Sequence, residues 1–153
     1  MDSTKIIYWG KQITIARSIA ENAHSGQFRK DGNTKYITHP VAVSELVTKQ
    51  VRETELLYLS SVALLHDVLE DTSVSIKDLA SANIDRKIIE GVVVLSRFAN
   101  ESYFEYILRV AKNKDCTLVK IADIVHNLST LGSDAESLRT RYYSALLILG
   151  GLG

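Results

Sequence analysis

Four ionisable residues at the end of an apolar stretch are the strongest chemical signal in the sequence. The segment Leu64–Asp71 reads LLHDVLED, and in it His66 and Glu70, like Asp67 and Asp71, are four residues apart. Residues at this spacing lie one turn apart on a helix, so the two pairs form adjacent columns on one side. Three carboxylates this close together would raise one another's pKa unless a cation lay among them. The cluster indicates a divalent metal site, although a solvated acidic helix end has the same composition.

Two further residues of metal-binding type lie in comparable settings. His39 comes directly before Pro40, a residue that fixes the geometry of a helix start. Asp123 lies in the apolar stretch LVKIADIV, where an unpaired carboxylate would be costly. Together with His66 and Asp67 they provide two imidazoles and two carboxylates, a mixed nitrogen and oxygen set that suits manganese, iron or zinc.

Helices joined by short turns must position these residues, because one proline and eight glycines in 153 residues leave little material for β-turns. The stretch that carries the acidic cluster predicts a helix over residues 53–69. It is apolar nearly all round, which is typical of the buried centre of a bundle. An apolar stripe predicts another helix over residues 8–24, and a polar, basic loop follows it as far as Thr38. Pro40 predicts the start of the next helix, which runs to about Gln50.

The second half of the chain predicts shorter helices with recognisable ends. Ser75 followed by Asp78 resembles a capping box, and Asp85 is placed to cap the helix after it. Further helical patterns cover residues 102–112, 116–131 and 134–149, with Gly132 as the stop between the last two. Because no linker divides the chain, the sequence predicts an all-α, single-domain bundle of about seven or eight helices over residues 1–153.

The composition argues against several classes of partner and compartment. Lys and Arg total 18 and so do Asp and Glu, which leaves no basic excess to favour nucleic acid or a membrane surface. The one cysteine, Cys116, cannot form an internal disulfide, and no apolar run approaches the roughly 18 residues of a membrane span. The N-terminus lacks the pattern of a signal peptide. The sequence therefore predicts a cytoplasmic protein and leaves its oligomeric state open.

Four blocks of sequence resemble one known family. They read GQFRKDG from Gly26, YITHP from Tyr36, LLHDVLEDT from Leu64 and VKIADIVHNLSTL from Val119. In this order they resemble the hydrolase domain of RelA/SpoT homologues, which belongs to the HD superfamily of metal-dependent phosphohydrolases. The resemblance covers roughly residues 10–149 and implies an HD-type fold. A chain of 153 residues cannot hold the synthetase and regulatory domains of the long members, so the small alarmone hydrolases are the expected type.

The resemblance implies a metal and its chemistry. One Mn²⁺ ion is expected to have four protein ligands: His39, His66, Asp67 and Asp123. Glu70 and Asp71 match the catalytic acids of the family, which orient and deprotonate the attacking water. Glu70 is our first choice for the residue that accepts the proton.

The resemblance also implies a guanine nucleotide as the small-molecule substrate. Arg29 and Lys30 match a pair in which the arginine stacks on the guanine and the lysine supports binding. Asn127 and Thr130 match positions that contact the ribose, and Arg139 with Tyr143 resembles a pair that reaches the phosphates. The loop after Arg29 and Lys30 is one residue longer than is usual in the family.

The function implied is Mn²⁺-dependent 3′-pyrophosphohydrolysis of ppGpp and pppGpp, which releases GDP or GTP together with pyrophosphate. Two alternatives remain open at this point. The chain could remove a phosphate from another nucleotide, such as the 2′-phosphate of NADPH, or it could be a binding module that senses a nucleotide without turnover. The presence of Glu70 and Asp71 favours an enzyme, because a sensor has no need of them.

Overall fold

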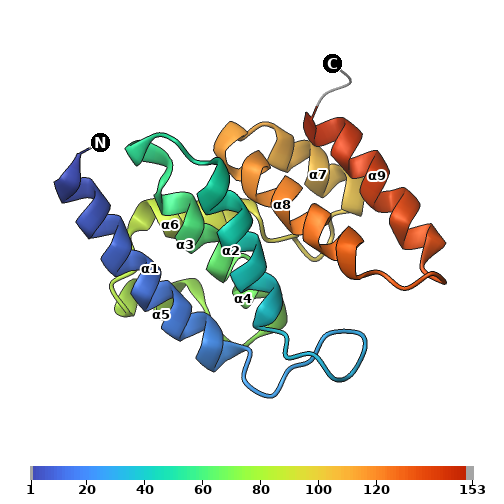
Figure 1. Ribbon diagram of the computed structural model, residues 1–153, viewed down its shortest axis with the longest axis horizontal. Helices are drawn as coiled ribbons and strands as arrows, with labels where there is room; N and C mark the ends of the chain where they lie inside the picture. Colours follow the sequence, from blue (N-terminus) through green and yellow to red (C-terminus); the bar gives the residue numbers. More distant parts are fainter. Residues whose placement is uncertain (1, 151–153) are drawn as a thin grey trace.

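Helices joined by turns build the protein, as the scarcity of proline and glycine predicts. The computed structural model describes residues 2–150, and no strand occurs among them. Along the chain (Figure 1) the elements are α1 (Ser3–Ala23), α2 (Thr38–Gln50), the 3₁₀ helix η1 (Thr54–Leu56), α3 (Tyr58–Leu65), α4 (Val68–Asp71), α5 (Ile76–Ser81), α6 (Arg86–Val94), α7 (Tyr103–Ala111), α8 (Lys114–Thr130) and α9 (Glu136–Gly150). The predicted all-α class is confirmed.

Local capping signals set several helix starts where the sequence places them. The Ser75 hydroxyl accepts a hydrogen bond from the Asp78 backbone, and the Asp78 carboxylate accepts one from the Ser75 backbone in return. The Asp85 side chain accepts from the backbone N–H of Lys87. Asp2 accepts from the backbone of the first turn of α1, which explains why this helix begins at Ser3 and not at the expected residue 8.

The expected helix over residues 53–69 is wrong, because the chain divides it into η1, α3 and α4. An unbroken helix would pair the N–H of Asp67 with the carbonyl of Ala63. Instead His66 Nδ1 lies 2.6 Å from that carbonyl oxygen and takes it as a hydrogen-bond partner. The pairs His66/Glu70 and Asp67/Asp71 therefore do not form two columns on one continuous helix.

Gly132 does not end α8 in the way the sequence suggests. The helix ends at Thr130 because Leu131 is extended, with φ −69° and ψ 139°. Within residues 2–150 the glycines with positive φ are Gly26 and Gly32, which both lie in the turns between α1 and α2. A residue in the left-handed conformation is thus not needed to stop α8.

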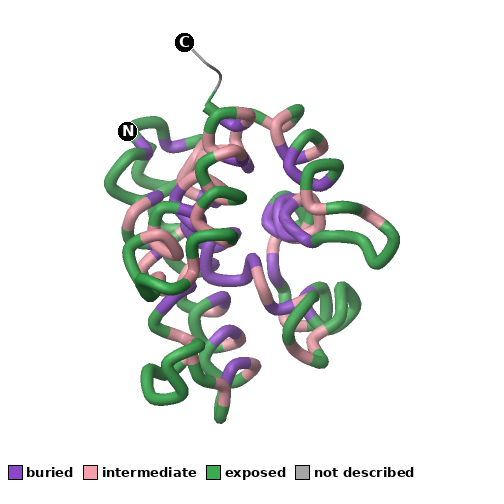
Figure 2. Tube along the Cα trace, turned by 90° about the vertical axis from the view of Figure 1, so that its right-hand side faces the viewer, coloured by how far each residue is buried: buried purple, intermediate pink, exposed green. Residues whose placement is uncertain are grey.

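The all-round apolar segment occupies the centre of the molecule, as predicted. All eight residues of α3 are buried, and α3 packs against α1, α2, α6 and α8. Gly91 of α6 lies so close to α3 that a Cβ added there would come within 2.9 Å of Val62 Cγ2. Figure 2 shows the buried segments, in purple, gathered in the interior of the molecule. Helices α7, α8 and α9 pack on one another, and α8 also contacts α2 and α3.

Within the described residues, no helix combines the length and the apolar character that crossing a membrane requires.

Candidate metal centre and adjoining cavity

The structure brings the four expected metal ligands together where α2, α3 and α8 meet. His39 Nε2 lies 2.9 Å from Asp123 Oδ1 and 3.8 Å from Asp67 Oδ2. His66 Nε2 lies 3.0 Å from Asp67 Oδ2 and 3.5 Å from Asp123 Oδ1. His39, His66 and Asp123 are buried, and the side chain of Asp67 is 18% exposed. Three residues separated by up to 84 positions thus offer donor atoms within 4.8 Å of one another: His39, His66 and Asp123.

His66 is oriented as a ligand by the same contact that ends α3. Its Nδ1 must carry the proton, because the Ala63 carbonyl oxygen can only accept a hydrogen bond. This leaves Nε2 directed at two carboxylates, yet among the described residues it has no hydrogen-bond partner of acceptable geometry. A buried polar atom without a partner is costly, and a cation between Nε2 and the carboxylates removes that cost. The donor set therefore fits a divalent metal ion.

The pKa shifts of the two histidines also fit a cation in the cluster. Burial by itself lowers the pKa of His66, but the charges of Asp67 and Asp123 outweigh it and raise this pKa well above its usual value. Burial also lowers the pKa of His39, and in that case burial prevails. The cluster consequently attracts positive charge to Nε2 of His66, where a proton and a metal ion compete.

A second layer of donors holds the two carboxylates. Tyr36 donates its hydroxyl to Asp67 Oδ2 at 2.5 Å, and Lys120 donates from Nζ to Asp123 Oδ2 at 2.7 Å. Asn127 donates to the other oxygen of Asp123 at 3.0 Å. Burial alone would raise the pKa of Asp123, but Lys120 and the neighbouring imidazoles hold it well below the usual value. Partners of this kind fix the orientation of metal-binding groups.

Tyr36 and Lys120 are the members of this layer that the sequence analysis missed. Lys120 has a local signal, since it lies three residues before Asp123 in the same apolar stretch and so on the same helix face. For Tyr36 the sequence gives no local signal apart from its position three residues before His39. His126, the residue before Asn127, has its Nδ1 2.7 Å from His39 Nδ1.

Glu70 and Asp71 lie on α4 beside the cluster, and the contacts of the two residues differ. Glu70 Oε1 accepts a hydrogen bond of 2.6 Å from the backbone N–H of Arg97, in the segment between α6 and α7. Asp71 lies on the side of the α1–α2 loop, where its carbonyl oxygen accepts a hydrogen bond from Gln27. Partial burial, and then the negative charge of Asp67, raise the pKa of both carboxyls. Only Glu70 has an oxygen fixed by a main-chain donor.

A cavity of about 410 Å³ adjoins the cluster. Its lining residues come from the α1–α2 loop, α8 and α9: Phe28, Arg29, Lys30, Asp31, Thr34, Tyr36, Thr38, His126, Asn127, Thr130, Leu131 and Tyr142. Three of them, Tyr36, His126 and Asn127, hydrogen bond to the expected ligands. These three side chains therefore connect the cavity wall to the cluster.

The expected substrate-binding residues fall into two groups. Arg29 donates from Nη2 to Asn127 Oδ1 at 3.0 Å and to Thr130 Oγ1 at 2.9 Å, so these three residues meet in the cavity wall together with Lys30. Arg139 and Tyr143 are not in that wall. Arg139 donates to the carbonyl of Gly132 at 3.0 Å, and Tyr143 is 55% exposed on α9.

Tyr142 is the α9 residue that lines the cavity, and it is not among the substrate-binding residues expected from the sequence. Cys116 is buried and its pKa is raised by burial to about 12, which leaves it a protonated and unreactive thiol.

Comparison with known proteins gives several relatives in sequence. No family model matches the chain. It is 36% identical over 134 residues to a guanosine-3′,5′-bis(diphosphate) 3′-pyrophosphohydrolase of Haemophilus influenzae, over 80% of this chain and 19% of the relative. It is 33% identical over 141 residues to the bifunctional (p)ppGpp synthase/hydrolase SpoT of Escherichia coli, over 86% of this chain and 20% of the relative. The chain spans about a fifth of the length of these curated relatives.

A solved structure shares the fold. It is described as a metazoan ortholog of SpoT that hydrolyzes ppGpp, and it superposes with a TM-score of 0.72 over 90% of this chain and 83% of its own. The sequence identity is 24%, so this similarity establishes a shared helical fold and no more.

Proposed function

We propose that this chain, a homologue of the RelA/SpoT-type (p)ppGpp hydrolases, is itself a Mn²⁺-dependent guanosine-3′,5′-bis(diphosphate) 3′-pyrophosphohydrolase. It converts ppGpp or pppGpp to GDP or GTP and pyrophosphate, and residues 1–153 form one HD-type phosphohydrolase domain. The observation that carries the proposal is the buried meeting of two imidazoles with two carboxylates beside a cavity of about 410 Å³. A cavity of this volume is within the usual range for small-molecule sites.

The ligands of the metal are the four residues of the cluster: His39, His66, Asp67 and Asp123. Two nitrogen and two oxygen donors suit manganese, iron or zinc, and Mn²⁺ is the ion that the family resemblance implies. The chemistry that the ion supplies when bound is Lewis acidity, which makes water a better nucleophile and offsets charge on the phosphate under attack.

Glu70 takes the proton of the attacking water in this mechanism. The hydrogen bond from Arg97 holds its Oε1, so Oε2 is the oxygen that remains to accept a proton. Partial burial and the charge of Asp67 raise its pKa, which makes the carboxylate a stronger base than an ordinary surface glutamate. Asp71 is the second acid, which the family resemblance assigns to orienting the water, and partial burial and the charge of Asp67 raise its pKa as well.

The wall of the cavity that the α1–α2 loop and α8 form binds the nucleoside. Arg29 presents a planar guanidinium that Asn127 and Thr130 hold by hydrogen bonds, and a plane held in this way suits stacking on guanine. Lys30 supplies positive charge at the same wall, where Asn127 and Thr130, the residues expected to contact the ribose, are hydrogen bonded to Arg29. Arg139 and Tyr143 lie outside the wall, so any contact of theirs is to phosphates that project from the cavity.

The first test is release of pyrophosphate from ppGpp by the purified chain, with and without added Mn²⁺. We expect release that depends on the metal and disappears in Asp67→Ala. Glu45→Ala, which removes an exposed carboxylate of α2, is the matched control and should retain activity. No release by the folded, metal-loaded chain would overturn the proposal.

A second experiment separates the alternatives that the sequence leaves open. Values of kcat/KM for ppGpp, pppGpp and NADPH rank the substrates directly. Preference for NADPH would assign a different phosphohydrolase, and tight binding of ppGpp without turnover would assign a sensor. The cytoplasmic location and the lack of nucleic-acid and membrane partners stay predictions of the sequence.

A further inference from the structure

An arginine of α7 holds the segment that joins α6 to α7. Arg109 donates from Nη1 to the carbonyl of Val94 at 2.9 Å and from Nη2 to the carbonyl of Ser96 at 2.8 Å. The same guanidinium forms a two-point ion pair with Glu101, with Nε to Oε2 at 2.8 Å and Nη2 to Oε1 at 3.0 Å. Both ends of the segment are therefore tied to one side chain, and paired contacts of this type fix geometry more strictly than a single bond.

The surroundings of this ion pair keep it from being an ordinary surface contact. The side chain of Glu101 is 11% exposed and that of Arg109 is 27% exposed. The Arg109 guanidinium lies 4.2 Å from the centre of the Phe98 ring, and Glu101 Oε1 also accepts from the backbone N–H of Phe98 at 3.1 Å. A lysine could not make this set of contacts, because it lacks a planar fork of donors.

The segment contributes one main-chain N–H group to the site, that of Arg97. Arg97 donates from its backbone nitrogen to Glu70 Oε1 at 2.6 Å, while its own side chain is exposed and turns to the carbonyl of Glu101. Glu70 lies on α4, a single helical turn that begins after the break at His66. A glutamate on so short a helix has several rotamers open to it, and fixing one of them costs conformational entropy.

We infer that the backbone N–H of Arg97 is a positioning group that holds the carboxylate of Glu70 in its working orientation, and that the Arg109–Glu101 pair keeps this N–H in place. The inference rests on the proposed role of Glu70 as proton acceptor. It assigns to the α6–α7 segment a function that no residue of the cavity wall performs, because no residue of this segment lines the cavity.

Two variants at one position test the inference directly. Arg97→Pro removes both the side chain and the N–H, whereas Arg97→Ala removes the side chain alone. We expect kcat for ppGpp to fall about tenfold in Arg97→Pro relative to Arg97→Ala, with KM and Mn²⁺ affinity unchanged, since misplacing a reacting group by a small distance has effects of at least this size. Equal kcat values in the two variants would overturn the inference.

A readout independent of turnover is the pKa of Glu70, measured by NMR titration of its side-chain carboxyl. The charged groups that influence it are Asp67, Asp71 and Lys120, and neither substitution removes any of them. The Arg97 N–H favours the carboxylate form, so its loss should raise the pKa of Glu70 in Arg97→Pro and not in Arg97→Ala. This comparison is informative even if the chain proves to hydrolyse a different nucleotide.

The substitution Glu101→Gln tests the same inference without introducing a proline into the segment. It preserves the shape of the side chain but removes the charge that pairs with Arg109, so the segment should loosen and kcat should fall in the same direction, with KM unchanged. Combining Glu101→Gln with Glu70→Gln should lower kcat no further than Glu70→Gln alone. Additive losses would show that the pair acts on folding and not through Glu70.

Discussion

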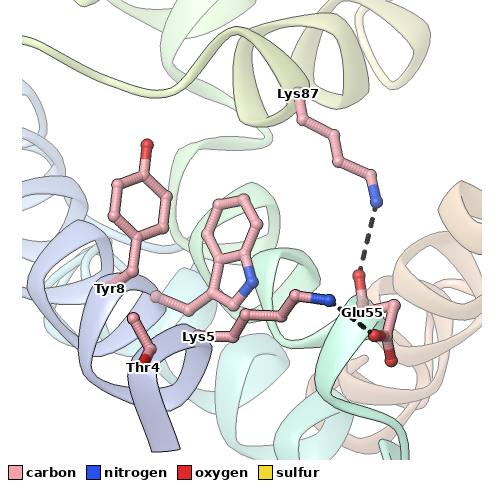
Figure 3. A pocket seen from close by; sticks show the side chains of 6 residues that line it. Thr4, Lys5, Tyr8, Glu55 and Lys87 are labelled. Atoms are coloured by element: carbon pink, nitrogen blue, oxygen red, sulfur yellow. Dashed lines mark hydrogen bonds and ion pairs between the residues drawn. The ribbon is translucent and has the colours of Figure 1, made fainter. Parts of the chain in front are cut away.

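Two cavities of nearly equal volume lie on different sides of this molecule, and only one has the character of a reaction site. The first, of about 420 Å³, lies between α1, η1 and α6 and appears in Figure 3. Lys5 donates to the Glu55 carboxylate at 2.9 Å, and Lys87 donates to the Glu55 carbonyl at 3.3 Å and lies over the Tyr58 ring. The charged groups around this cavity are already paired, and most of its wall is apolar.

The second cavity, of about 410 Å³, adjoins groups whose interactions within the described residues are incomplete. His66 Nε2 is buried without a hydrogen-bond partner beside two carboxylates, and Asp123 needs Lys120 to remain charged where it is. Volume therefore does not separate the two cavities. What separates them is whether buried polar groups converge without satisfying one another.

Removing a metal ligand should give the largest contrast between the cavities. We expect Asp123→Ala to lose Mn²⁺ and to lower kcat by at least about 10³-fold, because a bound metal contributes several kcal/mol to transition-state stabilisation. Glu55→Ala, in the other cavity, should change kcat by less than about twofold, as is usual for exposed ion pairs. Metal analysis and pyrophosphate release measure both effects. A similar loss of kcat in the two variants would show that the two cavities do not differ in their importance for activity.

Glu70→Gln should give the next largest effect and separates chemistry from metal binding. We expect kcat to fall by roughly 10²–10⁴, the usual contribution of general acid–base catalysis, while the Mn²⁺ content stays near that of the unmodified chain. The measurement is kcat alongside metal analysis of the same preparation. Full kcat, or loss of the metal, would assign Glu70 a different role.

A pair of lysine variants compares the two cavities residue for residue. Lys120→Met removes the partner of a buried carboxylate, so it should lower the metal-free stability by roughly 3–5 kcal/mol and activity by about 10–100-fold. Lys87→Met removes a lysine that bonds to a main-chain carbonyl at the other cavity and should leave kcat unchanged. Denaturant unfolding of the metal-free proteins measures the first effect. Equal stabilities would show that Lys120 has no special place beside Asp123.

Arg29→Lys should have the smallest effect of the four and sharpens the assignment of the cavity wall. A lysine keeps the positive charge but lacks the plane that Asn127 and Thr130 hold, so KM for ppGpp should rise about tenfold with little change in kcat. The metal affinity should be unaffected. A fall in kcat at constant KM would place Arg29 in the chemistry and not in binding.

The parts of the fold that could be predicted are those that neighbouring residues determine. The capping box at Ser75 and Asp78 sets a helix start from contacts three residues apart, and it forms as predicted. The buried character of α3 follows from its apolar residues alone. By contrast, the break after Leu65 depends on the His66 ring taking the Ala63 carbonyl, a competition that periodicity does not reveal.

The site shows the same division between residue type and placement. The convergence of His39, His66 and Asp123 follows from residue types that are costly to bury alone, and those types are visible in the sequence. The orientation of α9 is a matter of tertiary packing, so sequence reasoning favours Arg139 and Tyr143 where Tyr142 faces the cavity. Tyr36 was missed because its partner Asp67 is 31 residues away and nothing local indicates the contact.

The loop between α1 and α2 differs from the rest of the site in what orders it. None of residues 25–38 is buried, although they supply Arg29, Lys30 and Tyr36 to the cavity wall. Hydrogen bonds, such as those of Asp31 with Thr34, contribute to its order, and Ile37 is the loop residue that packs against the core while only partly buried. Segments of this kind open at a free-energy cost well below that of global unfolding. Backbone amides of this loop should therefore exchange with solvent deuterium much faster than those of α3 and α8. Under the proposed function, such opening would let the nucleotide enter and leave while the helices that carry the expected metal ligands stay folded.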